Sequence, residues 1–276
     1  MSRIKELFEK KQDRILNVYC TAGYPQLNST IEVIKILENA GADIIELGMP
    51  YSDPLADGPV IQASGAKALQ NGMTITKLFD QLKDFRTSSL ECGSNPTQHS
   101  IANPPLGDGG IPVILMGYLN PLLQYGFEKF CKKASEVGID GLIIPDLPEY
   151  EFEHEYKQIV EKYGLDFIFL VTPETSKERI KKLDSLSSGF LYAVSSSSLT
   201  GSDKDFSTVE NYLQRLQTMK LKNPVLVGFG IKDRASFESA CRYANGAIIG
   251  SAYIKALENA TDIEYATKEF LKGVIN

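Results

Sequence analysis

The chain has 276 residues, 43% hydrophobic and 23% charged, which is ordinary usage for a globular protein. Its formal net charge of −6 argues against a nucleic-acid partner, because binding a phosphate backbone needs clustered Lys and Arg. The charged start, MSRIKELFEK, is unlike a signal peptide, and no apolar run approaches the roughly 20 residues that span a bilayer. These features predict a soluble, cytoplasmic protein with no membrane segment.

Cysteines and histidines are too few and too scattered for a zinc centre or a disulfide framework. No Cys-x-x-Cys pair occurs, and the candidates are Cys20, Cys92, Cys131, Cys241, His99 and His154. We therefore expect buried or incidental thiols and no metal site.

Short apolar runs alternate with amphipathic segments along the chain. The runs rich in β-branched residues predict strands over 15–20, 43–47, 112–116, 141–144, 167–171, 190–194, 225–227 and 247–249. Between them, helical spacing predicts helices over 30–39, 74–85, 128–137, 149–163, 177–186, 208–219 and 233–243. This alternation is typical of βαβ units around a parallel sheet.

Glycines mark the ends of several predicted units. Gly41, Gly138 and Gly164 stand just before a strand, where a helix needs a residue in the left-handed conformation. The recurring pattern favours an α/β fold of the closed (β/α)8 type, a TIM barrel, as one domain over residues 1–276. A doubly wound open sheet is the alternative, but the stretch after the first strand (21–25, TAGYP) is not the Gly-rich dinucleotide loop such a sheet would carry.

One stretch interrupts the alternation. Residues 88–110 are dense in Ser, Gly, Asn and Pro, lack periodicity, and exceed the usual length of a helix-to-strand connection. Because this stretch leads into a strand, barrel topology puts it at the N-terminal face. We expect a flexible surface insertion before the third strand.

The strongest chemical motif is the run 46–59 (ELGMPYSDPLADGP), which leaves the second strand and enters a long loop. Side-chain alternation puts Ile44 and Glu46 on one face, so that Glu46 points into the barrel mouth if Ile44 packs inside. Barrel enzymes keep their catalytic groups at that end. A salt-bridge or solvated role for Glu46 is the alternative, but a loop fixed by prolines that presents three carboxylates favours general acid–base chemistry.

Glycine pairs follow the seventh and eighth strands. Gly228 and Gly230 flank Phe229, and Gly250 with Ser251 opens a short helix over 252–257. Barrels commonly bind phosphate through backbone N–H groups of these two loops. Either pair alone could be a turn, but both together favour a phosphate site.

The chain resembles the alpha subunit of tryptophan synthase. The likeness extends from 19–25 (YCTAGYP) through 142–148 (LIIPDLP) to the C-terminal glycine pairs, and the run 50–59 (PYSDPLADGP) is its most specific part. The resemblance implies retro-aldol cleavage of indole-3-glycerol phosphate to indole and glyceraldehyde 3-phosphate, with Glu46 and Asp57 as the catalytic pair. Asp57 would stabilise positive charge at the indole N1–H, and Glu46 would move protons at C3 and at the side-chain hydroxyl.

The chemistry implied by the resemblance needs no cofactor in this subunit, because it consists of proton transfers. We expect both acids in a solvent-filled mouth, with apolar surroundings favouring neutral Glu46 and a polar loop keeping Asp57 ionised. The remaining positions implied for substrate are Tyr19, Leu115, Ile143, Leu170, Tyr192, Thr200, Phe229 and Ile248. Those implied for phosphate are Gly201, Gly230, Gly250 and Ser251.

The serine-rich loop 195–201 is implied to close over substrate and bring Thr200 to Asp57, with a flexible linker as the alternative. The family commonly has a glycine at the place of Ser198. The resemblance also implies a pyridoxal-phosphate beta subunit as partner in an α2β2 complex. The loops expected at that interface contain Asp53, Asn120, Pro121 and Asp146.

Two rival functions remain open from sequence. Another phosphate-binding barrel of aromatic amino-acid biosynthesis is the nearest, although the synthase that makes indole-3-glycerol phosphate would be expected to carry a strand-end lysine. A non-catalytic barrel that only binds a partner is the second. Retention of both Glu46 and Asp57 speaks against it.

Overall fold

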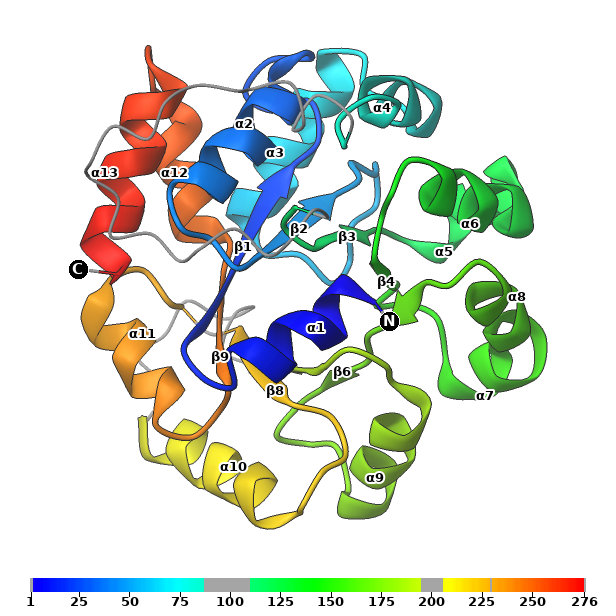
Figure 1. The fold of residues 1–276 in the computed structure, drawn as a ribbon, viewed down its shortest axis with the longest axis vertical. Helices are drawn as coiled ribbons and strands as arrows, with labels where there is room; N and C mark the ends of the chain where they lie inside the picture. Colours follow the sequence, from blue (N-terminus) through cyan, green and yellow to red (C-terminus); the bar gives the residue numbers. More distant parts are fainter. Residues whose placement is uncertain (1, 87–109, 195–205, 229, 276) are drawn as a thin grey trace.

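The computed structural model describes residues 2–86, 110–194, 206–228 and 230–275 (Figure 1). Its strands are β1 (Ile15–Thr21), β2 (Ile44–Gly48), β3 (Val113–Met116), β4 (Gly141–Ile143), β5 (Asp166–Phe167), β6 (Leu170–Val171), β7 (Leu191–Val194), β8 (Val225–Gly228) and β9 (Gly246–Ile249). All pair in parallel, in the order β5-β4-β3-β2-β1-β9-β8-β7-β6.

The two ends of this sheet are halves of one extended segment, which closes the barrel. Ile168 donates its N–H to the carbonyl of Leu142 on β4 at 3.0 Å, and Phe169 accepts from the N–H of Tyr192 on β7, also at 3.0 Å. The predicted strand 167–171 therefore bridges β4 and β7 without a continuous ladder to either. The architecture is the predicted (β/α)8 barrel.

Helices surround the sheet (Figure 1). They are α1 (Arg3–Lys10), α2 (Ser29–Asn39), α3 (Pro59–Gln70), α4 (Ile75–Leu82), α5 (Leu119–Tyr125), α6 (Phe127–Glu136), α7 (Glu149–Glu151), the π-helical turn η2 (Phe152–Tyr156), α8 (Lys157–Lys162), α9 (Lys177–Leu186), α10 (Phe206–Thr218), α11 (Arg234–Cys241), α12 (Ser251–Glu258) and α13 (Ile263–Ile275). Every predicted helix is present, and α1, α3, α5 and α13 are additional. The glycine caps are confirmed, since Gly41, Gly138 and Gly164 have φ values of 99°, 80° and 67°.

Side-chain alternation divides the core into two layers. One layer lies between strands and helices, and the other fills the barrel interior with Ile15, Ile44, Ile114, Ile143, Ile168, Phe190, Leu226 and Ile248. Ile4 and Leu7 of α1 belong to the interior cluster, and Figure 1 shows α1 lying across the centre of the sheet. A methyl group on Gly141, which opens β4, would lie 3.3 Å from Ile4 Cδ1. Helix α1 thus closes the N-terminal end of the barrel and leaves the C-terminal ends of the strands for a site.

The segment predicted as an insertion falls almost entirely outside the described residues. Its flanks lie where barrel topology puts them. Arg86 donates to the carbonyls of Ile111 at 2.7 Å and Gly138 at 2.9 Å, and it pairs with Asp140 at 3.0 Å, all just before β3 and β4. Among the described residues, no helix is both long and apolar enough to cross a membrane.

Candidate active site

Glu46 lies inside the barrel on β2. It pairs in register with Tyr19 of β1 and Ile114 of β3, and its neighbour on the same face, Ile44, belongs to the interior cluster as the alternation predicts. Its side chain is only 1% exposed. The expectation of a solvent-filled mouth is therefore wrong for this residue, because the surrounding strand ends enclose it.

Burial sets the protonation state of Glu46. Its pKa is raised from 4.5 to about 8, chiefly by loss of water; a hydrogen bond from Asn17 opposes this rise, and the nearby charge of Asp57 adds to it. That bond runs from Asn17 Nδ2 to Glu46 Oε2 at 3.2 Å. The carboxyl is therefore mostly neutral at neutral pH, as expected, yet it can ionise within the physiological range.

Asp57 is held on the loop between β2 and α3. It is 9% exposed, and burial raises its pKa to about 6, an effect that a hydrogen bond from the Tyr118 hydroxyl opposes. The same hydroxyl oxygen accepts from the N–H of Ala56 at 3.0 Å. Gln62 Nε2 donates to the Asp57 carbonyl at 2.8 Å and fixes the loop from the helix side. Asp57 is mainly ionised at neutral pH, but it titrates closer to neutrality than a polar loop predicts.

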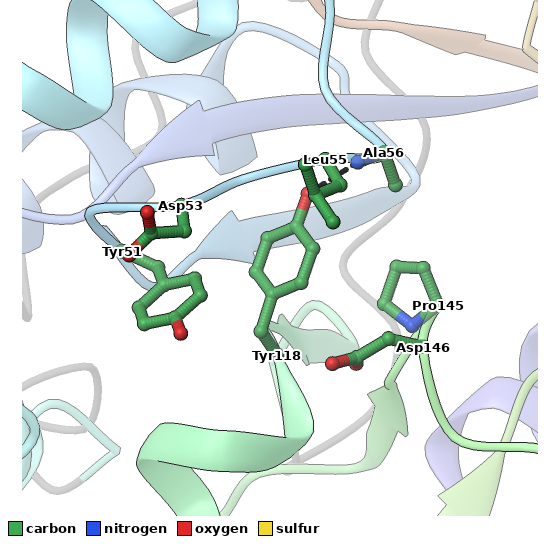
Figure 2. A pocket seen from close by; sticks show the side chains of 7 residues that line it. All are labelled: Tyr51, Asp53, Leu55, Ala56, Tyr118, Pro145 and Asp146. Atoms are coloured by element: carbon green, nitrogen blue, oxygen red, sulfur yellow. Dashed lines mark hydrogen bonds between the residues drawn. The ribbon is translucent and has the colours of Figure 1, made fainter.

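The sequence gives no indication that Tyr118 contacts Asp57, or that Asn17 contacts Glu46. Tyr118 follows β3 and stands in Figure 2 between the 53–56 stretch of the loop and Asp146, with its hydroxyl directed at Ala56. Its ring lies 5.3 Å from that of Tyr51. A rim pocket of about 350 Å³ is lined by Tyr51, Asp53, Leu55, Ala56, Tyr118, Pro145 and Asp146. The only available signal was an aromatic residue directly after a strand end.

Two tyrosines lie near the acids, Tyr19, which is buried, and Tyr192, which is partly buried. Loss of water on burial, together with the negative charge of Glu46 and Asp57, raises the pKa of both Tyr19 and Tyr192 well above the usual value. Each ring lies against a glycine of the neighbouring strand. A methyl group added at Gly48 would overlap the Tyr19 ring, and one at Gly228 would come within 2.7 Å of the Tyr192 hydroxyl.

The aliphatic residues implied for substrate divide into two groups. Ile143 and Ile248 belong to the interior cluster, and Leu170 packs against it. Leu115 does not, since it belongs to the layer between sheet and helices. Leu115 therefore points away from the barrel interior, and its assignment to the site is wrong. Met116, next along β3, packs against the interior cluster instead.

The proposed phosphate residues are described in part. Gly250 is the N-cap of α12, which begins at Ser251, and a methyl on Gly250 would lie 3.5 Å from Tyr19 Cβ. This helix start is therefore next to the acid site. Gly230, after β8, has φ of +45° and is exposed. Thr200, Gly201 and Phe229 lie outside the described residues.

The loops predicted to meet a partner are joined at the same end of the barrel. Asn120 Nδ2 donates to the Tyr51 hydroxyl at 3.2 Å, which links the loop after β3 to the loop after β2. Asp146 Oδ1 accepts from the N–H of Leu119 at 2.9 Å, which links the loop after β4. Asp53, Asn120 and Asp146 are exposed, whereas Pro121 is partly buried.

The thiols and imidazoles stand apart from this site or are inert. Cys20 and Cys131 are buried and Cys241 is partly buried, all unbridged. His154 is exposed and stacks on Tyr150 with ring centroids 4.1 Å apart. In the described part of the chain, no three His, Cys, Asp or Glu residues cluster as metal ligands would. Cys92 and His99 lie outside it.

Comparisons with known proteins agree with this geometry. The family model described as tryptophan synthase alpha chain matches residues 5–93 and 106–274, so the unmatched 94–105 fall inside the predicted insertion. The tryptophan synthase alpha chain of Flavobacterium johnsoniae is 52% identical over 261 residues, 94% of this chain and 95% of that protein. That of Parabacteroides distasonis is 46% identical and covers 99% of each chain.

Solved structures show the same likeness. The crystal structure of tryptophan synthase subunit alpha from Legionella pneumophila is 33% identical with a TM-score of 0.83, covering 99% of this chain and 97% of that one. Tryptophan synthase from M. tuberculosis gives a TM-score of 0.80 at 29% identity. Since the family model and these relatives cover nearly the whole chain, the chain belongs to the tryptophan synthase alpha chain family.

Proposed function

We propose that the two buried acids cleave indole-3-glycerol phosphate by proton transfer alone. Membership of the family gives the overall activity, that of a lyase which releases indole and glyceraldehyde 3-phosphate. The observation that carries the proposal is the pair of separated pKa values, about 8 for Glu46 and about 6 for Asp57. At neutral pH one acid holds its proton while the other is charged, which divides the acid and anion roles between them.

The proposed reaction begins with neutral Glu46. Its proton passes to indole C3, the positive charge that develops over the ring is stabilised at N1–H by the Asp57 carboxylate, and Glu46 becomes a carboxylate. That carboxylate then removes the proton of the C3′ hydroxyl, and the C3–C3′ bond breaks to give indole and the aldehyde. Glu46 ends as it began, so the cycle balances and requires no cofactor from this chain.

The interior wall suits a flat heterocycle. Ile143, Ile248 and Leu170 supply aliphatic surface, while Tyr19 and Tyr192 supply ring edges beside the acids. An indole bound against these residues would be recognised by its shape, and its charged intermediate would be shielded from water. We propose Thr200 and Phe229 as further contacts, on the family resemblance.

Phosphate binding is proposed for the backbone N–H groups at the start of α12 and in the Gly230 loop, with Gly201 joining them. The free N–H groups at a helix start attract an anion. We expect Gly250→Asp to weaken the binding of glycerol 3-phosphate by at least about tenfold, since it sets a like charge at that helix start. Isothermal titration calorimetry measures the affinity for glycerol 3-phosphate. Thr261→Asp, which adds the same charge at an exposed position, is the control, and equal affinities would show that phosphate binds elsewhere.

The indole produced is proposed to pass to a pyridoxal-phosphate beta subunit in an α2β2 complex in the cytoplasm. Supporting this, the exposed Asp53, Asn120 and Asp146 lie on interlinked loops at the same barrel end as the acids. Three proline-containing loops lower the ordering cost of docking, and Asp53 offers a charge to a basic residue across the interface.

A matched beta subunit is expected to raise indole release at least tenfold by ordering the loops of Asp57 and Thr200. Asp53→Lys should remove most of that gain. Steady-state assays measure the rate of indole release by wild type and by Asp53→Lys as the beta subunit is titrated. Asp80→Lys, on the outer helix α4, is the charge-reversal control. Equal stimulation of wild type and Asp53→Lys would show that Asp53 does not face the partner.

The direct test of the proposed function is incubation of the purified chain with indole-3-glycerol phosphate, with and without the beta subunit. Indole and glyceraldehyde 3-phosphate should appear in equal amounts. Binding of the partner without indole release would instead indicate a non-catalytic barrel. Conversion of a different phosphorylated intermediate would indicate another enzyme of aromatic amino-acid biosynthesis.

A further inference from the structure

A buried amide beside Glu46 is not explained by packing. Asn17 lies on β1 with its side chain wholly buried, two residues along the strand from Ile15 and in the same interior layer. Its Nδ2 donates to Glu46 Oε2 at 3.2 Å, whereas its Oδ1 has no hydrogen-bond partner among the described residues. A buried carbonyl oxygen left without a partner is costly, so the position is unfavourable for stability alone.

Within the described part of the chain, no cation accounts for the pKa of Glu46. The titratable groups that interact with it electrostatically within the described structure are Asp57 on the loop, Tyr19 on β1, Tyr192 on β7 and, in the outer layer of the core, Cys20. None of these carries positive charge. The Asn17 amide is therefore the donor that favours the ionised form of Glu46 against burial.

We infer that Asn17 is a positioning residue that holds the Glu46 carboxyl in both of its protonation states. The inference rests on the proposed function, in which Glu46 alternates between acid and base. The inference is based on the two ends of one buried amide: Nδ2 donates to the Glu46 carboxyl, while Oδ1 has no partner among the described residues.

The amide can serve each state because it carries a donor and an acceptor on one short side chain. When Glu46 is ionised, Asn17 Nδ2 donates to it, as in the structure. When Glu46 is protonated, a half-turn of the amide presents Oδ1 to the acid proton, since the terminal torsion of Asn is broad and nearly two-fold. The amide then holds the carboxyl in one orientation through the proton-transfer cycle, and Nδ2 donates again once the acid proton has passed to the substrate carbon.

The first test replaces the amide by an apolar side chain of similar size, Asn17→Leu. The Glu46 carboxyl is followed by carbon-13 NMR in the full chain while the pH is varied. The wild-type midpoint is expected near 8, and loss of the donor should raise it by at least about one pH unit. The falling limb of the kcat/KM profile for indole release should move by the same amount. An unchanged midpoint would overturn the inference.

Thr267→Val is the control, because it removes a buried hydrogen bond to Tyr253 at 2.9 Å without touching Glu46. It should lower stability and leave the Glu46 midpoint where it is. The wild-type protein provides a second measurement that needs no variant. The nitrogen-15 shift of the Asn17 side-chain amide should titrate with the midpoint of Glu46, and a flat response would contradict the pairing.

These outcomes separate the inference from the proposed function. If the wild-type chain released no indole, the proposed function would fail, while the NMR midpoints would still decide whether Asn17 controls Glu46. If indole were released but the midpoints of wild type and Asn17→Leu agreed, only the role of Asn17 would be lost.

Discussion

Glu46→Gln is expected to lower kcat for indole release by at least about 10²-fold, because glutamine keeps the shape of the side chain but cannot exchange a proton with C3 or with the hydroxyl. Asn17 can still pair with the new amide, so the fold should persist. Steady-state kinetics together with thermal unfolding measure the two effects separately. Activity within a factor of a few of wild type would remove Glu46 from the proton-transfer role.

The stability of Glu46→Gln provides an independent check on the buried acid. The folded-state pKa of Glu46, about 8, exceeds its ordinary 4.5, so the folded protein binds more protons than the unfolded chain between these values. The contribution of this group to the free energy of unfolding is at its maximum below pH 4.5 and is lost as the pH rises toward 8. The melting temperature of wild type should therefore fall relative to Glu46→Gln over that window, and parallel curves would show that Glu46 titrates normally.

Asp57→Asn is expected to reduce kcat/KM by a similar factor, at least about 10²-fold, for a different reason. Asparagine keeps the acceptor that Tyr118 needs, so the loop should stay in place, but it carries no charge to stabilise N1–H of the protonated ring. The same assays apply. Asp80→Asn, a carboxylate removed from the exposed face of α4, is the control and should leave indole release unchanged.

A small effect of Asp57→Asn would contradict electrostatic stabilisation by this residue. The pH dependence of the variant sharpens the result. The rising limb of the wild-type profile near pH 6 belongs to Asp57 and should disappear from any residual activity of the variant. A limb that persisted would have to be assigned to another group.

The spacing of apolar residues and the glycines that end helices were enough to predict most of the fold. The alternation of β-branched runs with helical spacing located all strands, because strands buried on both faces read as apolar runs. The split between β5 and β6 was not predictable, since it depends on the segment changing partners from β4 to β7. Helix α3 escaped notice because its buried positions, Ser64, Gly65 and Ala68, are too small to form an apolar stripe.

The parts of the site that follow from side-chain alternation along a strand could be predicted. The parts that depend on tertiary packing could not. Glu46 and its interior direction follow from Ile44 on the same strand. Leu115 was assigned to the site by the family resemblance, and the apolar run of this doubly buried strand does not show which of its residues face the interior. The partners of the acids lie on other elements, Asn17 on β1 and Tyr118 on the loop after β3. Only the register of β1 against β2 and the path of that loop bring them into contact with the acids.

The pH profile of kcat/KM for indole release by the wild-type chain tests the two-carboxylate account most directly, since it reports the essential acid and base of the free enzyme. A bell-shaped dependence of kcat/KM on pH is expected. Activity should rise as Asp57 ionises through pH 6 or so and fall as Glu46 loses its proton through about pH 8. Activity that stayed level from pH 5 to 9 would contradict it, because neither buried carboxyl would then control the reaction.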